Sequence, residues 1–250
     1  MNKASGIFLI LLLVIATGFF PAFPQKLEET RTVKIFGRVT DFKGQAIEGA
    51  TVELKDSRFS DVARTNSGPD GRYSLVIPKG HYMALTAVKG YQVRSLEYWA
   101  WNVPADRDIE IDPRFDRLEV YALNAWRPQG AYPSYQIYFR PMSLVKTAAT
   151  VMKAGGMEGL NKLPLIDISP DLEAGDIEVN VDGERVDVLR VNKVREASGP
   201  AQDIFAYLIQ VSLPKTAAVG DWIVFDVILS DRDTGEKGER RLYFPRPQSR

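Results

Sequence analysis

From Val33 onward the sequence alternates short runs of β-branched and aromatic residues with turn residues, at a spacing of about 8–12 positions. The run Val33–Thr40 is closed by the turn Asp41–Gly44, and the run Tyr73–Ile77 is stopped at Pro78. Within such runs apolar and polar side chains alternate, so one face of each strand is buried while the other meets water. This pattern predicts an all-β protein built from β-sandwiches.

An ordered series of turn glycines and strand residues between Gly37 and Tyr82 carries a resemblance to a known family. The series comprises Gly37–Asp41, Gly44, Ile47–Val52, Thr65, Asp70–Leu75, Pro78, Gly80 and Tyr82. The glycines suit tight turns, and Ala50 and Val52 alternate toward a core. The series resembles the carboxypeptidase regulatory-like domain. The resemblance covers residues 33–112 and implies a transthyretin-like sandwich, a fold grouped with starch-binding and collagen-adhesin B-type modules.

Peptidase activity does not follow from this resemblance. In carboxypeptidases a separate zinc domain cleaves the peptide, and that domain needs two histidines and a glutamate. The chain has one histidine, His81, and no cysteine, so the zinc carboxypeptidase domain is absent. His81 has no nucleophile or orienting carboxylate near it in sequence, and we interpret it as a turn residue.

Beyond the resemblance, residues 113–164 predict a connection and residues 165–247 predict a second sandwich. The connection contains an aromatic-rich loop and a helix expected over 143–157, where apolar residues recur at helical spacing. In the second sandwich, Ile177–Val181 alternates cleanly and the following Asp-Gly pair is a hairpin signal. Several antiparallel runs of this kind favour an immunoglobulin-like sandwich.

The N-terminus predicts export. Lys3 precedes the apolar run Ile7–Ala16, which is short for a hydrocarbon layer of roughly 30 Å. We therefore expect residues 1–22 to be a signal peptide. The alternative is an uncleaved membrane anchor, which would be the chain's one link to a membrane. Because a cysteine-free exported chain fits a bacterial periplasm or exterior, the expected location is secreted or periplasmic.

Aromatic residues concentrate between Tyr91 and Phe139 and include three of the four tryptophans. Sugars stack on flat aromatic faces, and protein interfaces favour Tyr and Trp, so this segment supplies candidate ligand-binding residues. The candidates are Tyr98, Trp99, Trp101, Trp126 and Tyr135. Three interpretations stay open: packing in a seam between the two sandwiches, which we favour, a platform for a partner protein, and a glycan-binding surface.

One acidic loop near the C-terminus is a weak metal candidate. Asp231 and Asp233 alternate before Gly235 in a way that can place carboxylates around a calcium ion. Calcium takes 6–8 oxygen ligands, and the loop shows too few. A hairpin turn is therefore the favoured interpretation, and we expect no cofactor.

Charge and composition complete the functional prediction. The 32 Lys and Arg residues balance 32 Asp and Glu residues, which argues against a nucleic-acid partner. We expect a non-enzymatic binding or assembly module that recognises another extracytoplasmic protein or a glycan. The first alternative is a carbohydrate-binding accessory protein that uses its aromatic side chains. The second is a hydrolase that works with carboxylates alone.

Overall fold

Alternating side chains produce the strands in both halves of the protein. In β1 (Thr32–Arg38), Val33 and Ile35 are buried while the residues between them face outward. In β15 (Trp222–Ser230), every second residue from Ile223 to Leu229 is buried in the same way. Burial of one face of each strand therefore fixes its register, since a slip of one residue would expose the apolar set.

The computed structural model describes residues 31–199, 202–216 and 220–247, which belong to one compact unit. The predicted signal peptide, residues 1–22, lies outside the described residues. The first half contains β1, β2 (Thr51–Lys55), β3 (Asp61–Asn66), β4 (Arg72–Pro78), β5 (Gly80–Val88), β6 (Tyr98–Ala105) and β7 (Ile109–Glu110). The second half contains β8 (Leu118–Trp126), β9 (Ser134–Ser143), α1 (Leu144–Lys153), α2 (Met157–Leu160), β10 (Leu165–Ile166), the 3₁₀ turn η1 (Ala174–Asp176), β11 (Ile177–Val181), β12 (Glu184–Val186), β13 (Val188–Gly199), β14 (Gln202–Ser212), β15 and β16 (Lys237–Pro245).

The first half is a two-layer β arrangement. Strands β4, β1 and β7 form one sheet, and strands β6, β5, β2 and β3 form the facing layer. Ile35 and Leu75 come from the first layer, and Leu54 and Leu85 come from the second, within one buried apolar core. The Tyr73 hydroxyl in this core donates a 2.7 Å hydrogen bond to the Ile111 carbonyl oxygen, which satisfies its polar tip.

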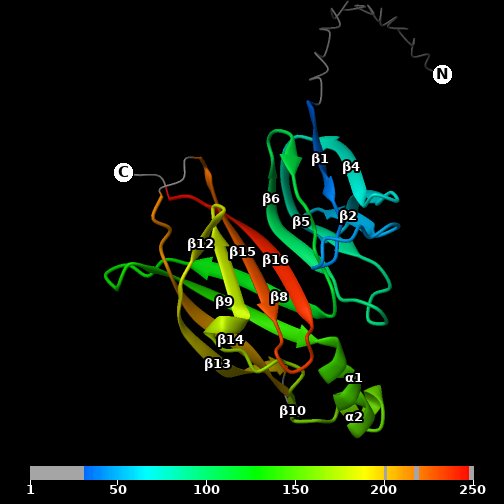
Figure 1. Cartoon of the computed structure of the whole chain (residues 1–250), viewed down its shortest axis with the longest axis vertical. Helices are drawn as coiled ribbons and strands as arrows, with labels where there is room; N and C mark the ends of the chain where they lie inside the picture. The colour runs from blue at the N-terminus through cyan, green and yellow to red at the C-terminus, as the bar shows by residue number, and fades with distance from the viewer. Residues whose placement is uncertain (1–30, 200–201, 217–219, 248–250) are drawn as a thin grey trace, which may run out of the picture. The chain divides into compact units, whose positions relative to one another are not determined.

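The second half repeats the two-layer plan with different strands. The sheet β13, β14, β9 and β8, with β10 parallel beside β14, faces the layer β12, β11, β15 and β16. Figure 1 shows β15 and β16, drawn in orange and red, running side by side. Phe139 and Ile209 from one layer meet Val179 and Phe225 from the other in a second apolar core.

The two halves share one sheet. Strand β16 pairs in parallel with β6, and Arg240, Arg241 and Leu242 lie opposite Trp99, Ala100 and Trp101. The result is a continuous sheet in the order β12-β11-β15-β16-β6-β5-β2-β3. The described residues thus form a mostly β protein with several sheets, and its helices are minor.

The segment 113–164 differs from its prediction as a connection. It contains β8 and β9, which pair with each other and belong to the second core. Pro133 and Pro141 made the segment resemble a loop, although Tyr135, Ile137 and Phe139 alternate inward between them. The short loop between β8 and β9 holds only part of the aromatic-rich stretch.

The helix predicted over 143–157 is observed as α1, which ends earlier. Ser143 is its N-cap, and the Ser143 hydroxyl accepts a hydrogen bond from the Lys146 amide. Gly155 follows the C-cap with a φ of 74°, a left-handed conformation that suits glycine at the end of a helix. Among the described residues, no helix combines the length and apolarity needed to cross a bilayer.

Gly238 on β16 provides a stability test of the contact between β16 and β8. A Cβ atom built on Gly238 would lie 2.0 Å from the Leu118 carbonyl oxygen, so the Gly238→Ala variant must shift backbone. We expect this variant to lose about 1–3 kcal/mol of unfolding free energy in urea denaturation. Gly175→Ala is the matched control, because a Cβ there meets nothing within 4 Å. Equal losses in the two variants would contradict the close approach of β8 and β16.

Candidate functional site

The five predicted aromatic candidates do not form one site. Tyr98 is 1% exposed and belongs to the first core, and Tyr135 lies in the second core with its ring edge-on to Phe225. Trp126 is 41% exposed at the end of β8. Burial in two separate cores thus removes Tyr98 and Tyr135 from any shared binding surface.

Trp99 and Trp101 do come together. Their ring centroids lie 5.1 Å apart with an interplanar angle of 15°, on the face of β6 opposite Tyr98. Both rings are partly buried, and Trp101 packs against the second core and meets the edge of Phe59. The seam between the two halves is therefore where this tryptophan pair lies.

Arg240 is the central side chain of this seam, and sequence analysis missed it. The residue is fully buried, and its guanidinium carbon lies 5.4 Å, 5.7 Å and 5.6 Å from the ring centroids of Trp99, Trp101 and Tyr121. Its Nε and Nη1 have no hydrogen-bond partner. Cation–π and N–H···π contacts are the interactions that remain for this guanidinium. Burial lowers the pKa of Arg240 to about 10, so the side chain is charged at neutral pH.

Glu119 on β8 is the one carboxylate paired with Arg240. It is 2% exposed, and its Oε1 accepts a long 3.4 Å hydrogen bond from Arg240 Nη2, while its Oε2 has no partner among the described residues. Burial raises the pKa of Glu119 to about 7, because the single nearby guanidinium only partly offsets the loss of hydration. This carboxyl therefore changes its charge within the physiological pH range.

A cavity of about 280 Å³ opens beside this pair. Its lining residues are Tyr91, Glu97, Trp99, Glu119, Tyr121, Arg140, Met142, Ile166, Ile168, Ser198, Ile204 and Phe205. Tyr91 and Tyr121 are more than 40% exposed, whereas Glu119 is buried. Burial also raises the pKa of Glu97, the second carboxyl in the lining. The cavity thus combines aromatic and aliphatic walls with two partly or fully desolvated carboxyls.

Backbone strain concentrates around the same aromatic residues. Five described non-glycine residues have positive φ angles. Among these, Gln92, Asn102 and Ala122 directly follow Tyr91, Trp101 and Tyr121, and Phe59 itself contacts Trp101. Ala122 lies within a register irregularity of β8. Positive φ in non-glycine residues carries strain that recurs at binding sites, and a bulge re-aims the side chains beside it.

Two polar cavities of about 440 Å³ and 430 Å³ differ from the aromatic cavity in their charge pairing. Both are lined by Asp226 and Arg241, which form a bidentate ion pair with distances of 2.6 Å and 3.0 Å. In the second, Arg114 pairs with Glu239 at 2.6 Å. These charges are satisfied by each other, and among the described residues neither cavity has a buried carboxylate oxygen without a partner, as Glu119 does.

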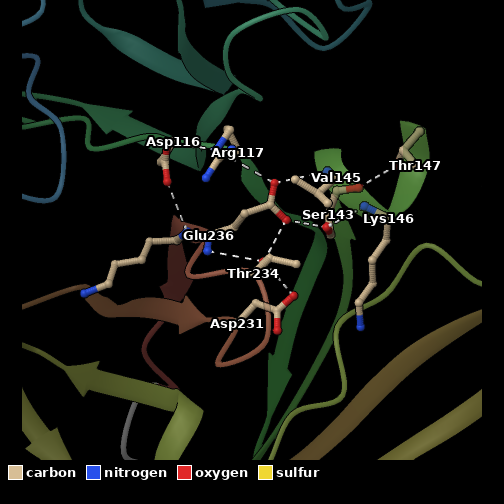
Figure 2. Close-up of polar contacts among 10 residues, drawn as sticks. Asp116, Arg117, Ser143, Val145, Lys146, Thr147, Asp231, Thr234 and Glu236 are labelled. Carbon is tan, nitrogen blue, oxygen red and sulfur yellow. Dashed lines mark hydrogen bonds and ion pairs between the residues drawn. The ribbon is translucent and has the colours of Figure 1, made fainter. Parts of the chain in front are cut away.

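The predicted metal loop is organised as a hairpin turn (Figure 2). Asp231 Oδ1 accepts a hydrogen bond from the Asp233 amide, and Asp231 Oδ2 accepts one from the Thr234 hydroxyl. Asp233 itself is exposed. In the described part of the chain, no three His, Cys, Asp or Glu side chains lie together as a metal site would require. The geometry therefore assigns the Asp231 carboxylate to its own turn.

Glu236 in the same hairpin docks the start of α1. This fully buried carboxylate accepts hydrogen bonds from the Ser143 hydroxyl and the Val145 amide. The Thr234 hydroxyl, which donates to Asp231, lies 3.1 Å from it, and Arg117 lies 4.0 Å away. Figure 2 shows the carboxylate between the hairpin and the start of the helix. The loop before β16 thus holds the end of β9 and the start of α1 in place through hydrogen bonds.

Comparison with known proteins assigns the first half. Residues 34–113 match the carboxypeptidase regulatory-like domain, as the sequence predicts, so this part of the chain is a domain of that family. No curated protein matches the chain significantly.

Several solved structures share a distant similarity with most of the chain. The major pilin subunit of Bacillus cereus is 11% identical, with 85% of this chain and 67% of the pilin covered and a TM-score of 0.28. A DUF3823 family protein from Parabacteroides merdae is 13% identical, with coverages of 86% and 100% and a TM-score of 0.28. A putative adhesin from Bacteroides ovatus is 8% identical, with coverages of 85% and 83% and a TM-score of 0.25. These TM-scores are too low for the similarities to indicate function.

The hairpin's role is tested by Glu236→Ala. Two donors, the Ser143 hydroxyl and the Val145 amide, lose their acceptor in this variant, so we expect a loss of about 2–4 kcal/mol of unfolding free energy and faster amide exchange at Val145. Asp233→Ala is the control and should stay within about 0.5 kcal/mol of the wild type. A melting temperature that rises with millimolar calcium in the wild type, but not in Asp233→Ala, would instead support the metal interpretation.

The raised pKa of Glu119 predicts a pH dependence of stability. The pKa of this carboxyl rises from 4.5 to about 7 on folding, so the folded state holds the proton more tightly. The protonated carboxyl adds up to about 3 kcal/mol to the free energy of unfolding. This contribution is complete below about pH 4.5 and is lost as the pH rises through 7. Urea unfolding between pH 5 and about pH 8 should therefore show a shallower decline in Glu119→Gln than in the wild type.

The titration of Glu239 also affects the pH dependence of stability in both the wild type and Glu119→Gln. Burial raises the pKa of Glu239 to about 6, so it contributes a decline of the same sign in both proteins, and only the difference between their slopes reports Glu119. Parallel slopes in the wild type and Glu119→Gln would show that the carboxyl is ionised normally in the folded protein.

Proposed function

We propose that the protein is an exported, non-enzymatic binding or assembly module that recognises another extracytoplasmic surface. Recognition would use the aromatic cavity beside Glu119, with the two-layer sheets as a rigid frame. Rigid presentation lowers the entropy lost on binding, which is the advantage of placing a site on strands rather than on a long loop.

The observation that carries this proposal is the unpartnered, buried carboxylate in the cavity lining. Buried polar groups are normally hydrogen-bonded, yet among the described residues Glu119 Oε2 and the indole nitrogen of Trp99, both from the cavity lining, have no partner. An occupant that supplies the missing partners would recover the interaction that folding leaves unmade. The exposed rings of Tyr91 and Tyr121 would add apolar contact area at the entrance.

The proposal also includes the form of each half and the location of the protein. We extend the proposal to a transthyretin-like form for the first half, which its family suggests, and to an immunoglobulin-like form for the second. The two-layer β arrangement of strands β8–β16 supports this extension. Secretion or periplasmic location rests on the signal-peptide pattern at residues 1–22.

Site-specific photocrosslinking in the native host tests the proposal. A photoreactive amino acid replaces Tyr121 at the cavity, and in a control protein it replaces the exposed Val76 on β4. We expect a discrete extracytoplasmic adduct from position 121 and none from position 76. The adduct should disappear when Glu97→Gln is added, because that variant keeps the shape of the cavity and removes a carboxylate.

Three outcomes would contradict the proposal. These are equal adducts at both positions, no adduct at position 121, and fractionation of the chain with the cytosol. The carbohydrate-binding alternative rests on the stacked Trp99–Trp101 pair. It predicts retardation in glycan affinity gels that vanishes in Trp99→Ala and Trp101→Ala variants.

A further inference from the structure

We propose that the aromatic cavity accepts the ammonium group of a lysine side chain from a partner polypeptide. The inference rests on the proposed function and adds the chemistry of the group that is recognised. It follows from the charge, the walls, the size and the surroundings of the cavity.

When Glu97 and Glu119 are both ionised, the charges around the cavity leave one negative charge in excess. Arg140, in the lining, is already paired with Glu196, so its charge does not neutralise Glu97 or Glu119. Arg240 lies behind the aromatic rings and balances one of the two carboxylates, Glu97 or Glu119. A monovalent cation in the cavity would neutralise the remaining charge in a poorly solvated place, where electrostatic attraction is strongest.

A second charge cluster near Glu97 does not alter this balance. Lys55 lies close enough to lower the pKa of Glu97, but its ammonium group is bound by Glu53 at 2.9 Å and Asp61 at 2.6 Å. Arg64 pairs with Glu53 as well. Two cations and two anions thus neutralise each other outside the cavity, and Glu97 keeps its own charge.

The walls suit an ammonium group on an apolar stem. Tyr91, Trp99 and Tyr121 provide aromatic rings, and aromatic faces attract cations. Ile166 and Ile204 provide aliphatic contacts for methylene groups. Glu119 Oε2 lacks a donor, and the terminal torsion of a glutamate is soft, so a small rotation presents this oxygen to an N–H group.

Size and neighbouring strands favour a polypeptide as the source of the cation. The volume of about 280 Å³ lies just below the range of roughly 300–1,000 Å³ for small-molecule sites, so one side chain is a suitable occupant. Ser198, near the end of β13, lines the cavity, so part of the rim is strand backbone that a polypeptide carrying the side chain can contact.

Peptide titrations of the full chain test the proposal. The probe is acetyl-Gly-Lys-Gly-amide, followed by tryptophan fluorescence and isothermal titration calorimetry. The matched peptide carries Nε-acetyl-lysine, which keeps the stem and removes the charge. We expect at least tenfold weaker binding of the acetylated peptide, and weaker binding of n-butylammonium, which has no peptide backbone to contact the cavity rim near Ser198.

Protein variants assign the binding to the cavity. Glu97→Gln and Tyr121→Ser should each weaken the lysine peptide at least fivefold. The matched controls, Glu158→Gln and Tyr132→Ser, change exposed residues outside the lining and should leave the affinity unchanged. Melting curves of all four variants separate loss of binding from loss of folding.

The pH dependence supplies an independent readout. The charged and titratable groups around Glu119 are Arg240 from β16, Glu97 before β6, Arg140 from β9, which is paired with Glu196, and the Tyr91 and Tyr121 hydroxyls. A cation prefers the ionised carboxylate, so affinity for the lysine peptide should rise by up to about tenfold between pH 6 and about pH 8. The acetylated peptide should show no such rise.

Several results would overturn the proposal. These are equal binding of the two peptides, tighter binding of acetyl-Gly-Glu-Gly-amide, n-butylammonium binding as tightly as the peptide, and unchanged affinity in Glu97→Gln. An adduct at position 121 without lysine preference would leave surface recognition intact and remove only the lysine assignment. Lysine preference without any adduct in the host would keep the lysine assignment of the cavity and contradict the proposal that the protein recognises an extracytoplasmic surface.

Discussion

The parallel pairing of β6 with β16 is the constraint on which the rest of the structure depends. It joins strands more than a hundred residues apart in sequence and converts two four-stranded layers into one sheet. Because side chains of a strand alternate between faces, β6 must serve both cores. Tyr98 and Ala100 enter the first core, while Trp101 packs against the second.

Because β6 serves both cores, its pairing with β16 accounts for the buried charge of Arg240 at the seam between the two halves. In the register of the pair, Arg240 lies opposite Trp99, and a stack of aromatic rings replaces water around the guanidinium. A buried ion pair gains little net stability, since desolvation offsets most of its attraction. The long contact between Arg240 and Glu119 is consistent with this, and it leaves a carboxylate whose protonation responds to its surroundings.

Local patterns predicted much of the fold, and long-range pairing accounts for what they missed. Alternation identified β1, β4, β11 and β15, and the glycine and tyrosine series identified the family of the first half. Strand β9 was missed because Pro133 and Pro141 bracket a run that is apolar on one face only, and β8 was assigned to the connection although Leu118–Ala122 has a strand pattern. Trp99 and Trp101 were found as aromatic residues, but Arg240 and Glu119 carry no local signal that places them beside those rings.

The candidate site is therefore a property of this chain's two halves together rather than of its recognised family. Tyr91, Glu97 and Trp99 lie within the carboxypeptidase regulatory-like domain, whereas Glu119 and Tyr121 come from β8. Both sets line the cavity, together with residues from β9, β10, β13 and β14. Since β8 is held against β16, and β16 is paired with β6, the pairing that unites the sheets also assembles the site. A family member that lacks the second half would share the sandwich of residues 34–113 without this chemistry.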